Sequence, residues 1–163
     1  MTESSSSTAG TVARVARLLK RIAESDGEIA ISRLATQLDL APSTVHRLLH
    51  LLMAEGFVER APGSHRYRIG LELYRVGALV ADRVDVPKIA RPVMRSLAEA
   101  CNEFCMLCVY LPSEREIMIA EIAKSRHPIG YGAEKYRKMA IAWGATGKAI
   151  LAYLPEEERD RLL

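Results

Sequence analysis

Apolar residues between positions 31 and 56 repeat with the period of two short helices. The first helix has an apolar edge, which consists of Leu34, Ala35 and Leu38. The second has a stripe at positions i, i+3, i+4 and i+7, which consists of Val45, Leu48, Leu49 and Leu52. Asp39 and Leu40 interrupt the pattern, and Pro42 suits the first turn of a helix because its missing N–H has no partner there. The pattern predicts a helix-turn-helix.

The opposite face of the second helix is polar. It carries Ser43, His46, Arg47 and His50, and Thr44 lies beside them near the helix start. The DNA major groove accepts one helix, and its floor offers purine acceptors that Arg47 or His46 can reach. Short hydroxyl side chains near a helix start suit phosphates or base edges. We expect a DNA-reading helix, although an ordinary helical hairpin with a solvated face has the same pattern.

Two short segments with alternating apolar and polar residues follow these helices. They are Phe57–Arg60 and Arg66–Ile69, and a turn-forming Pro-Gly-Ser sequence lies between them, so they predict a β-hairpin. The hairpin carries the basic or potentially basic side chains Arg60, His65, Arg66 and Arg68. Beside a DNA-reading helix, such a wing would contact phosphates or a minor groove. A charged hairpin edge also protects strands against aggregation, so the wing indicates DNA binding only together with the helices.

The start of the chain predicts a flexible tail followed by a packing helix. Residues 1–10 are rich in Ser, Thr and Gly and contain too few apolar residues to build a core. From Thr11 to Ser25 the apolar residues have helical spacing, and they are Val12, Val15, Leu19 and Ile22. Asp26 and Gly27 end this helix.

The segment Leu71–Asp85 predicts a helix with two apolar sides. One stripe contains Leu73, Val76, Gly77, Val80 and Val84, and the other contains Leu71, Tyr74, Ala78 and Ala81. One side can pack on its own domain, and the other most simply on a second copy of the chain. A dimer of this kind would place two recognition helices about one helical turn of DNA apart. Burial between two domains of one chain is the alternative.

The second half of the chain predicts an α+β domain. A helix begins near Val86, and its apolar stripe consists of Ile89, Val93, Leu97 and Cys101. Strand-like runs follow at Phe104–Leu111 and Glu116–Ile122, with a polar turn between them. Residues 125–139 predict a loop with room for a short strand, and Ala145–Tyr153 predicts a helix before a final acidic turn.

The three cysteines have the C-x3-C-x2-C spacing that holds iron–sulfur clusters in some enzymes. They are Cys101, Cys105 and Cys108. In a regular strand, Cys105 and Cys108 point to opposite faces and cannot share a cluster. The favoured interpretation is that they are small hydrophobic core residues, and an iron–sulfur protein is the minor alternative. The sequence has no catalytic signature, so we expect no enzyme activity, cofactor or metal site.

Composition limits the class of protein without choosing a function. The chain has 163 residues, of which 49% are hydrophobic, and a formal net charge of +3, so we expect a folded protein for which nucleic acid is one compatible partner. No apolar run approaches the roughly 20 residues of a membrane span, and the polar start lacks the apolar segment of a secretory signal. We therefore expect a cytoplasmic protein without membrane association.

Several motifs resemble those of the IclR family of bacterial transcriptional regulators. The sequence PSTVHRLL at 42–49, then EGFV at 55–58 and YRIG at 67–70, resembles the DNA-binding domain of that family. The sequence ATGKAILA at 145–152 resembles a small-residue segment of its effector-binding domain. Two positions depart from the family pattern, because Asp39 stands where the turn usually has Gly and Ala30 where a Ser or Thr often caps the helix.

The resemblance implies a domain organisation and a set of partners. A winged helix-turn-helix over 11–70 and a linker helix over 71–85 would precede residues 86–163, the first part of a GAF-like α+β effector domain that is truncated relative to the family. The implied partners are double-stranded operator DNA, a small organic-acid effector and a second copy of the chain in a homodimer, possibly a tetramer. The implied function is transcription regulation, as a repressor or as an activator, between which the sequence does not decide.

Two alternatives stay open beside this resemblance. The implied effector pocket includes Ala145, Thr146 and Gly147, but a plain helix start with small residues for close packing fits the same segment. The winged helix would otherwise be a protein-interaction module that binds no DNA.

Overall fold

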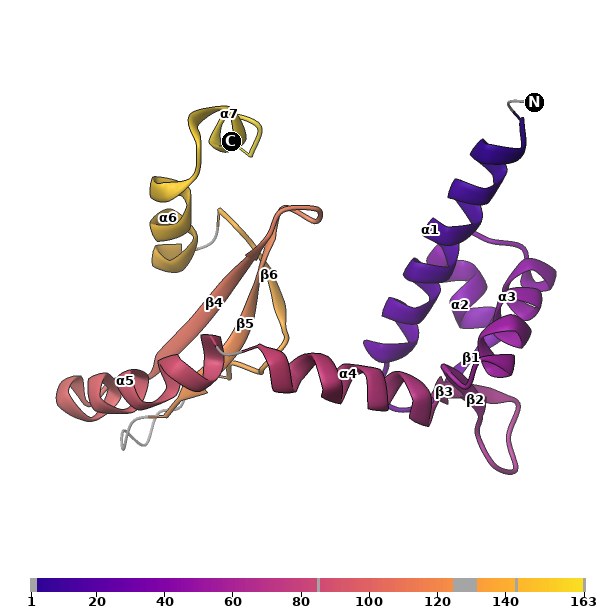
Figure 1. Cartoon of the computed structure of the whole chain (residues 1–163), viewed down its shortest axis with the longest axis horizontal. Helices are drawn as coiled ribbons and strands as arrows, with labels where there is room; N and C mark the ends of the chain where they lie inside the picture. The colour runs from indigo at the N-terminus through magenta and orange to yellow at the C-terminus, as the bar shows by residue number, and fades with distance from the viewer. Residues whose placement is uncertain (1–2, 85, 125–131, 143, 163) are drawn as a thin grey trace. The chain divides into compact units, whose positions relative to one another are not determined.

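The computed structural model describes residues 3–84, 86–124, 132–142 and 144–162. The chain divides into two compact units, Met1–Arg83 and Val84–Leu163, and Figure 1 shows the elements of each. Each unit combines helices with a three-stranded antiparallel sheet, which confirms the predicted α+β class. None of the helices described combines the length and apolar character that a membrane crossing requires.

The first unit has the element order of a winged helix-turn-helix. Its described elements are α1 (Glu3–Ala23), β1 (Ile29–Ala30), α2 (Ile31–Leu38), α3 (Pro42–Ala54), β2 (Val58–Arg60), β3 (Arg66–Ile69) and α4 (Leu71–Arg83). The predicted hairpin is present as β2 and β3. The short strand β1, which the sequence pattern did not indicate, pairs with the other edge of β3 and gives the strand order β1-β3-β2.

The two departures from the family pattern lie at the two ends of α2. Asp39 has left-handed backbone with φ 52°, a conformation that Asp tolerates better than most residues with a side chain. The amide of Leu40 donates to the carbonyl of Ala35 at 3.0 Å and closes the end of α2. Ala30 precedes α2 without any side-chain capping bond, and Pro42 occupies the first turn of α3.

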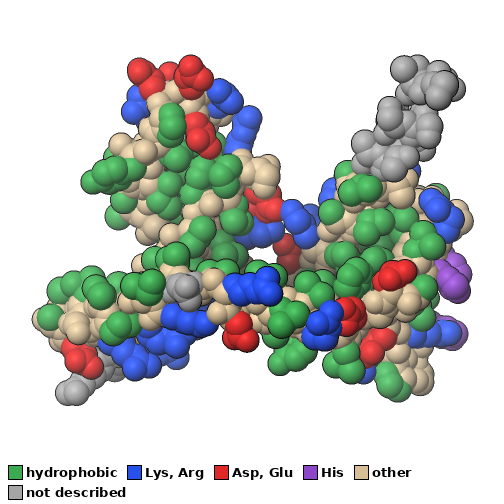
Figure 2. All heavy atoms as spheres, viewed as in Figure 1, with side chains coloured by type: hydrophobic (Ala, Val, Ile, Leu, Met, Phe, Trp, Pro, Cys, Tyr) green, Lys and Arg blue, Asp and Glu red, His purple; other side chains and the backbone are tan. Residues whose placement is uncertain are grey.

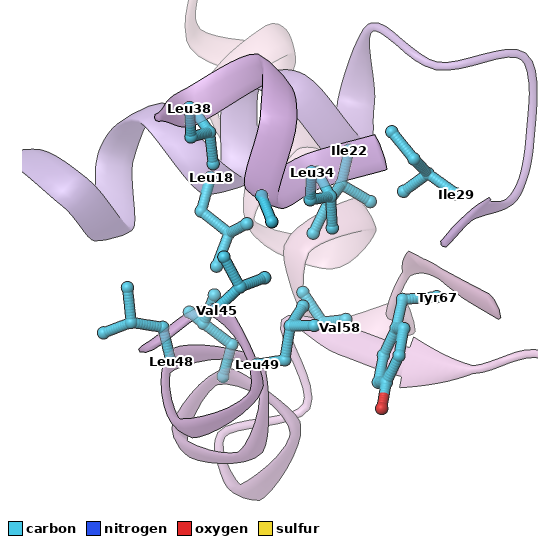
Figure 3. Packing of buried hydrophobic residues seen from close by; sticks show 12 residues of the cluster. Leu18, Ile22, Ile29, Leu34, Leu38, Val45, Leu48, Leu49, Val58 and Tyr67 are labelled. Carbon is cyan, nitrogen blue, oxygen red and sulfur yellow. The ribbon is translucent and has the colours of Figure 1, made fainter. Parts of the chain in front are cut away.

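The core of the first unit forms where α1, α2, α3 and the sheet meet (Figure 3). The largest fully buried side chains there are Leu18, Ile22, Leu34, Val45, Leu48, Leu49 and Val58. The predicted stripe of α1 was wrong at its start, because Val12 is 64% exposed and Leu18 packs in the core instead.

Helix α1 also begins earlier than the sequence predicts. It starts at Glu3 rather than Thr11, so most of the segment expected to be a flexible tail is helical. Adding residues to an existing helix costs much less than nucleating one. The packed turns around Leu18 and Ile22 supply that nucleus, and the Ser-rich residues continue it.

Gly70 fixes the point where the chain leaves the wing. A Cβ at this position would lie 2.2 Å from the carbonyl oxygen of Gly56, so only glycine fits. Its amide donates to the carbonyl of Phe57 at 2.9 Å. The close approach ties the end of β3 to the segment that follows α3 and sets where α4 begins.

The second unit is built on a separate sheet with the order β4-β5-β6. Its described elements are α5 (Val86–Cys101), β4 (Cys105–Leu111), β5 (Glu116–Ala123), β6 (Lys138–Ala140), α6 (Gly144–Tyr153) and α7 (Glu156–Arg159). One apolar cluster joins α5 to β4 and β5 through Met94, Ala98 and Ala123. A second joins β5 to α6 through Ile117, Ile141 and Leu151.

Helix α5 buries a different face from the one that its apolar spacing predicted. Met94 and Ala98 are buried, whereas Ile89 is 70% exposed and Val93 and Leu97 are exposed too. The helix is apolar on two sides, so periodicity alone does not decide which side packs. The side with the small Ala98 faces the sheet, because a small residue allows close packing.

The cysteine geometry differs from the prediction as well. The pairing of β4 with β5 shifts between Leu107 and Cys108, and such a bulge inserts one extra residue. Cys105 opposes Ala123 and Cys108 opposes Ile119, so the two cysteines lie on one face rather than on opposite faces. They are still three residues apart on a strand, roughly 10 Å.

A buried carboxylate connects α5 to the sheet. Glu121 on β5 has only 6% of its side chain exposed and forms ion pairs with Arg91 of α5, at 2.7 Å, and with Lys135. The amide of Ile122 also donates to it at 3.1 Å. The hydrogen bonds from Lys135 and Arg91 lower the pKa of Glu121 from its ordinary 4.5 to about 2. The charge is compensated on both sides, as burial requires.

This carboxylate predicts a specific acid dependence of stability. A depressed pKa stabilises the folded chain above the unfolded value near 4.5, and the contribution disappears as the pH falls toward 2. Between pH 5 and pH 2, wild type should lose up to about 3 kcal/mol more unfolding free energy than Glu121→Gln. Urea titrations followed by circular dichroism measure this difference. Glu103→Gln, at an exposed carboxyl of the same unit, should keep the wild-type pH dependence, and an identical profile for Glu121→Gln would refute the assignment.

Candidate nucleic-acid interface

Helix α3 exposes its polar face because its apolar face is buried in the core of the first unit. Val45, Leu48, Leu49 and Leu52 are all buried, so residues on the opposite side of the same helix must point outward. Ser43, His46, Arg47 and His50 are exposed, and Thr44 is half-buried. The structure therefore leaves the predicted DNA-reading side chains accessible.

The amides near the start of α3 are partly used within the protein. Those of Thr44 and Val45 both donate to the carbonyl of Ala41, at 2.9 and 3.1 Å. Within the part of the chain that the structure describes, Arg47 has no ion pair and His46 and His50 have no side-chain hydrogen bond. These three side chains are available to an external partner.

The basic side chains of the wing differ in whether they have a partner within the protein. Arg60 donates through Nε to the carbonyl of Ser64 at 3.0 Å, and its Nη2 contacts Nδ1 of His65. A guanidinium has only donors, so Nδ1 of His65 acts as the acceptor. The backbone amide of Arg66 donates to the hydroxyl of Ser64 at 3.1 Å. The side chain of Arg66 is exposed and extends from the strand.

Arg68 is already paired inside the wing. Its Nε donates to Oε1 of Glu59 at 2.6 Å, with 44% of the arginine side chain and 39% of the glutamate side chain exposed. The pairing register of β2 and β3 places Glu59 directly opposite Arg68. Glu59 is not among the residues that the sequence pattern singled out, because counting outward from the predicted Pro-Gly-Ser turn pairs it with Tyr67, one residue before its partner in the structure. Arg66 is thus more available for phosphate than Arg68.

Histidine side chains mark this region of the surface. Figure 2 shows them in purple on the first unit, close to lysine and arginine side chains. His46 and His50 come from α3 and His65 from the wing. The structure thus brings basic and potentially basic groups from two elements to the exterior of one small unit.

The second unit contains a cavity of about 390 Å³ with a mostly apolar lining. The lining residues are Met106, Ile119, Gly132, Ala133, Arg137, Lys138, Met139 and Ala140. Lys138 forms an ion pair with Glu114 at 2.7 Å. Arg137 has no side-chain partner among the residues described, so it is the accessible cation of this lining. The cavity suits a small ligand with an apolar body and an anionic group.

The predicted effector residues do not line this cavity. Ala145 is exposed, Thr146 is half-buried and Gly147 is buried at the start of α6. A Cβ on Gly147 would lie 1.6 Å from the carbonyl oxygen of Ile141. Gly147 is therefore required for close packing of α6 on the segment before it, which is the alternative that the sequence left open.

The cysteines show no sign of a shared site. Cys101 is exposed, and Cys105 and Cys108 are partly buried, all as free thiols. Burial raises the pKa of the Cys108 thiol, which disfavours the thiolate that metal binding needs. Among the described residues, no three His, Cys, Asp or Glu side chains lie close enough together to hold a metal ion.

Comparisons with known proteins agree with this geometry. Residues 11–62 match the IclR helix-turn-helix domain, and residues 78–163 match the C-terminal domain of bacterial IclR transcriptional regulators. The transcriptional repressor IclR of Escherichia coli is 32% identical over 153 residues, which cover 94% of this chain and 56% of that protein. The acetate operon repressor of Salmonella typhimurium is 30% identical with the same coverage. The chain thus spans about half the length of these curated relatives.

Solved structures show the same fold. A crystal structure of an IclR-type regulator from Silicibacter sp. has a TM-score of 0.78 at 28% identity, covering 93% of this chain and 59% of that one. An IclR homolog from Microbacterium hydrocarbonoxydans, crystallised with 4-hydroxybenzoate, has a TM-score of 0.73 at 21% identity, covering 93% and 62%.

The pair in the wing generates a prediction about phosphate binding. Glu59→Gln removes the partner of Arg68, so nonspecific duplex binding should strengthen about three- to tenfold at low salt, and the slope of log K against log salt should steepen by up to about 0.9. Fluorescence anisotropy across a salt series measures both quantities. Glu72→Gln, which releases Arg75 from a similar pair on α4, is the matched control and should change neither. Unchanged binding by Glu59→Gln would exclude Arg68 from the phosphate contacts.

Proposed function

This chain belongs to the IclR family of bacterial transcriptional regulators, and we propose that its first unit binds double-stranded operator DNA in order to repress transcription in the cytoplasm. The observation that supports this most is the exposed polar face of α3, held outward by a fully buried apolar stripe. A basic wing follows it in the same unit.

The exposed residues are proposed to contact DNA in two ways, at base edges and at the phosphate backbone. Arg47 and His46 are in the middle of the exposed face of α3 and are proposed to contact base edges in the major groove. Ser43 and Thr44, near the helix start, are proposed to position the backbone, with His50 one turn further along the helix. On the wing, Arg66 is proposed to contact phosphate. His65 and Arg68 can do the same once their partners release them.

Substituting Arg47 tests the assignment of base contacts. Arg47→Ala should weaken binding to a cognate operator by about 1–3 kcal/mol and affect unrelated duplexes much less. The operator is obtained by sequencing genomic fragments that the wild-type chain retains, and anisotropy titrations then compare the variants. Arg95→Ala, which removes an exposed arginine from α5 in the second unit, should bind as wild type does. Equal losses on every duplex would reduce Arg47 to a phosphate contact.

The rival function, a protein-interaction module, predicts a different salt response. True phosphate binding must weaken at least tenfold over a modest rise in salt when a few phosphates are contacted. A wild-type chain that ignores all duplexes at low ionic strength would contradict the proposed function altogether.

The second unit is proposed to bind a small organic-acid effector in its cavity. Apolar side chains surround most of the space, and Arg137 offers a cation for a carboxylate. The neighbour from Microbacterium hydrocarbonoxydans, whose complex contains 4-hydroxybenzoate, has a ligand of this chemical type. Ala145, Thr146 and Gly147 at the start of α6 do not line this cavity, so they are not part of the proposed effector site.

Helix α4 is proposed to join two copies of the chain, and further association to a tetramer is compatible with it. No residue of this helix is buried in the described chain, and it exposes Leu71, Tyr74, Leu79 and Val80. Exposed apolar stripes of this length usually mark an interface. Half-sites one helical turn apart would match a dimer of winged helices.

A charge on this stripe should separate the copies. Tyr74 is 73% exposed, so Tyr74→Glu should leave the fold intact and weaken self-association at least about tenfold, since a carboxylate would be desolvated at the contact. Sedimentation velocity over a concentration series measures the change. Arg75→Gln, on the neighbouring exposed side of α4, should sediment as wild type does. Wild-type association by Tyr74→Glu would place the interface elsewhere.

A further inference from the structure

Glu121 lies where two otherwise separate parts of the second unit meet. Its Oε2 accepts from Nη2 and Nε of Arg91 on α5, at 2.7 and 3.2 Å. Its other oxygen, Oε1, pairs with Lys135, in the segment before β6. Arg91 and Lys135 are 48% and 40% exposed, while the carboxylate between them is only 6% exposed. One buried anion therefore holds two partly exposed cations from different elements.

The segment around Lys135 forms one wall of the cavity. Gly132 and Ala133 precede this lysine and Arg137 follows it, and all three line the space. Hydrogen bonds to Ile119 anchor part of the segment, because the amide of Tyr136 donates to the carbonyl of Ile119 at 2.7 Å and the amide of Ile119 donates to the carbonyl of Arg137 at 3.1 Å. Through Lys135, Glu121 adds a side-chain tie between this wall and β5.

The first turns of α5, which contain Arg91, have no fully buried side chain. Pro92 lies inside the helix, and a proline in that position removes one helical hydrogen bond. Before Pro92, Val86 and Ile89 are exposed. The fully buried residues of α5 are Met94 and Ala98, and Ala90 is partly buried against the same cluster. The ion pair between Arg91 and Glu121 therefore adds a charged contact to the first turns of α5, which follow α4 in the chain.

We propose that Glu121 is a positioning residue that couples the wall of the cavity to the first turns of α5. When the segment 132–140 is fixed in place, Lys135 stays paired with Glu121, and the carboxylate that Arg91 binds is ordered. The segment and the first turns of α5 therefore stabilise each other. Such coupling is reciprocal by thermodynamic necessity. The inference rests on the proposed function only in naming the cavity an effector site, since the coupling itself needs no ligand. A ligand that immobilises the wall would then tighten the helix that follows the linker.

Hydrogen–deuterium exchange of the full chain, without effector or DNA, tests this coupling in both directions. Lys135→Gln should accelerate amide exchange in residues 86–91 about fivefold or more, although Lys135 is not on that helix. Arg91→Gln should accelerate exchange in residues 132–140 to a similar degree. Lys135→Arg keeps the charge and should restore wild-type exchange at α5, which a purely local loosening of the segment would not require.

Glu114→Gln is the matched control. It breaks the ion pair with Lys138, which joins β6 to the turn between β4 and β5, and should accelerate exchange near 138–140 while leaving residues 86–91 unchanged. If Lys135→Gln alters only its own segment and Arg91→Gln only α5, the proposal is overturned. Both substitutions are at partly exposed side chains, so the test does not depend on whether Glu121→Gln folds. Failure of DNA or effector binding would leave these exchange results unaffected.

Discussion

Burial of one apolar stripe on α3 determines what the first unit can do. Leu48 and Leu49 are fully buried among α1, α2 and the sheet, and each large aliphatic side chain removed from water contributes about 1.5–3 kcal/mol. Rotating α3 to turn its polar face inward would expose this stripe and bury His46 and Arg47 without partners. The orientation of the polar face is therefore a consequence of the core and does not depend on the presence of DNA.

The same unit shows that counting positive charges is a poor measure of a nucleic-acid surface. Arg68 and Arg60 both have partners within the wing, whereas Arg47 and Arg66 extend from their elements without an ion pair in the described residues. An arginine with a partner must give up that contact before it can hold a phosphate, so its net gain on binding is smaller. Strand register therefore decides which basic residues of the wing already have a partner, a difference in availability for phosphate that is not visible in the sequence.

The sequence was sufficient for α3 and the hairpin, which each have a single apolar face. It predicted α3, the hairpin and the break at Asp39, because periodicity and turn chemistry agree there. It failed where a choice depended on partners distant in the chain. Helix α5 has two apolar sides, so the buried side depends on the sheet, and the bulge after Leu107 depends on pairing with β5. For the site, it found the exposed residues but omitted Glu59 and the cavity, which forms only when β4, β5 and the segment before β6 come together.

The two units differ in what fixes their geometry. A single continuous core holds the first unit, whereas the second has separate clusters around Ala98 and around Ile117. Glu121 lies on β5 between the residues of these two clusters, where a buried charge would be costly without its two cations. Apolar contacts tolerate small shifts, but an ion pair with two hydrogen bonds to one carboxylate oxygen requires a defined position of Arg91. An ion pair therefore helps to fix the position of α5 on its sheet, whereas apolar packing fixes the position of α3.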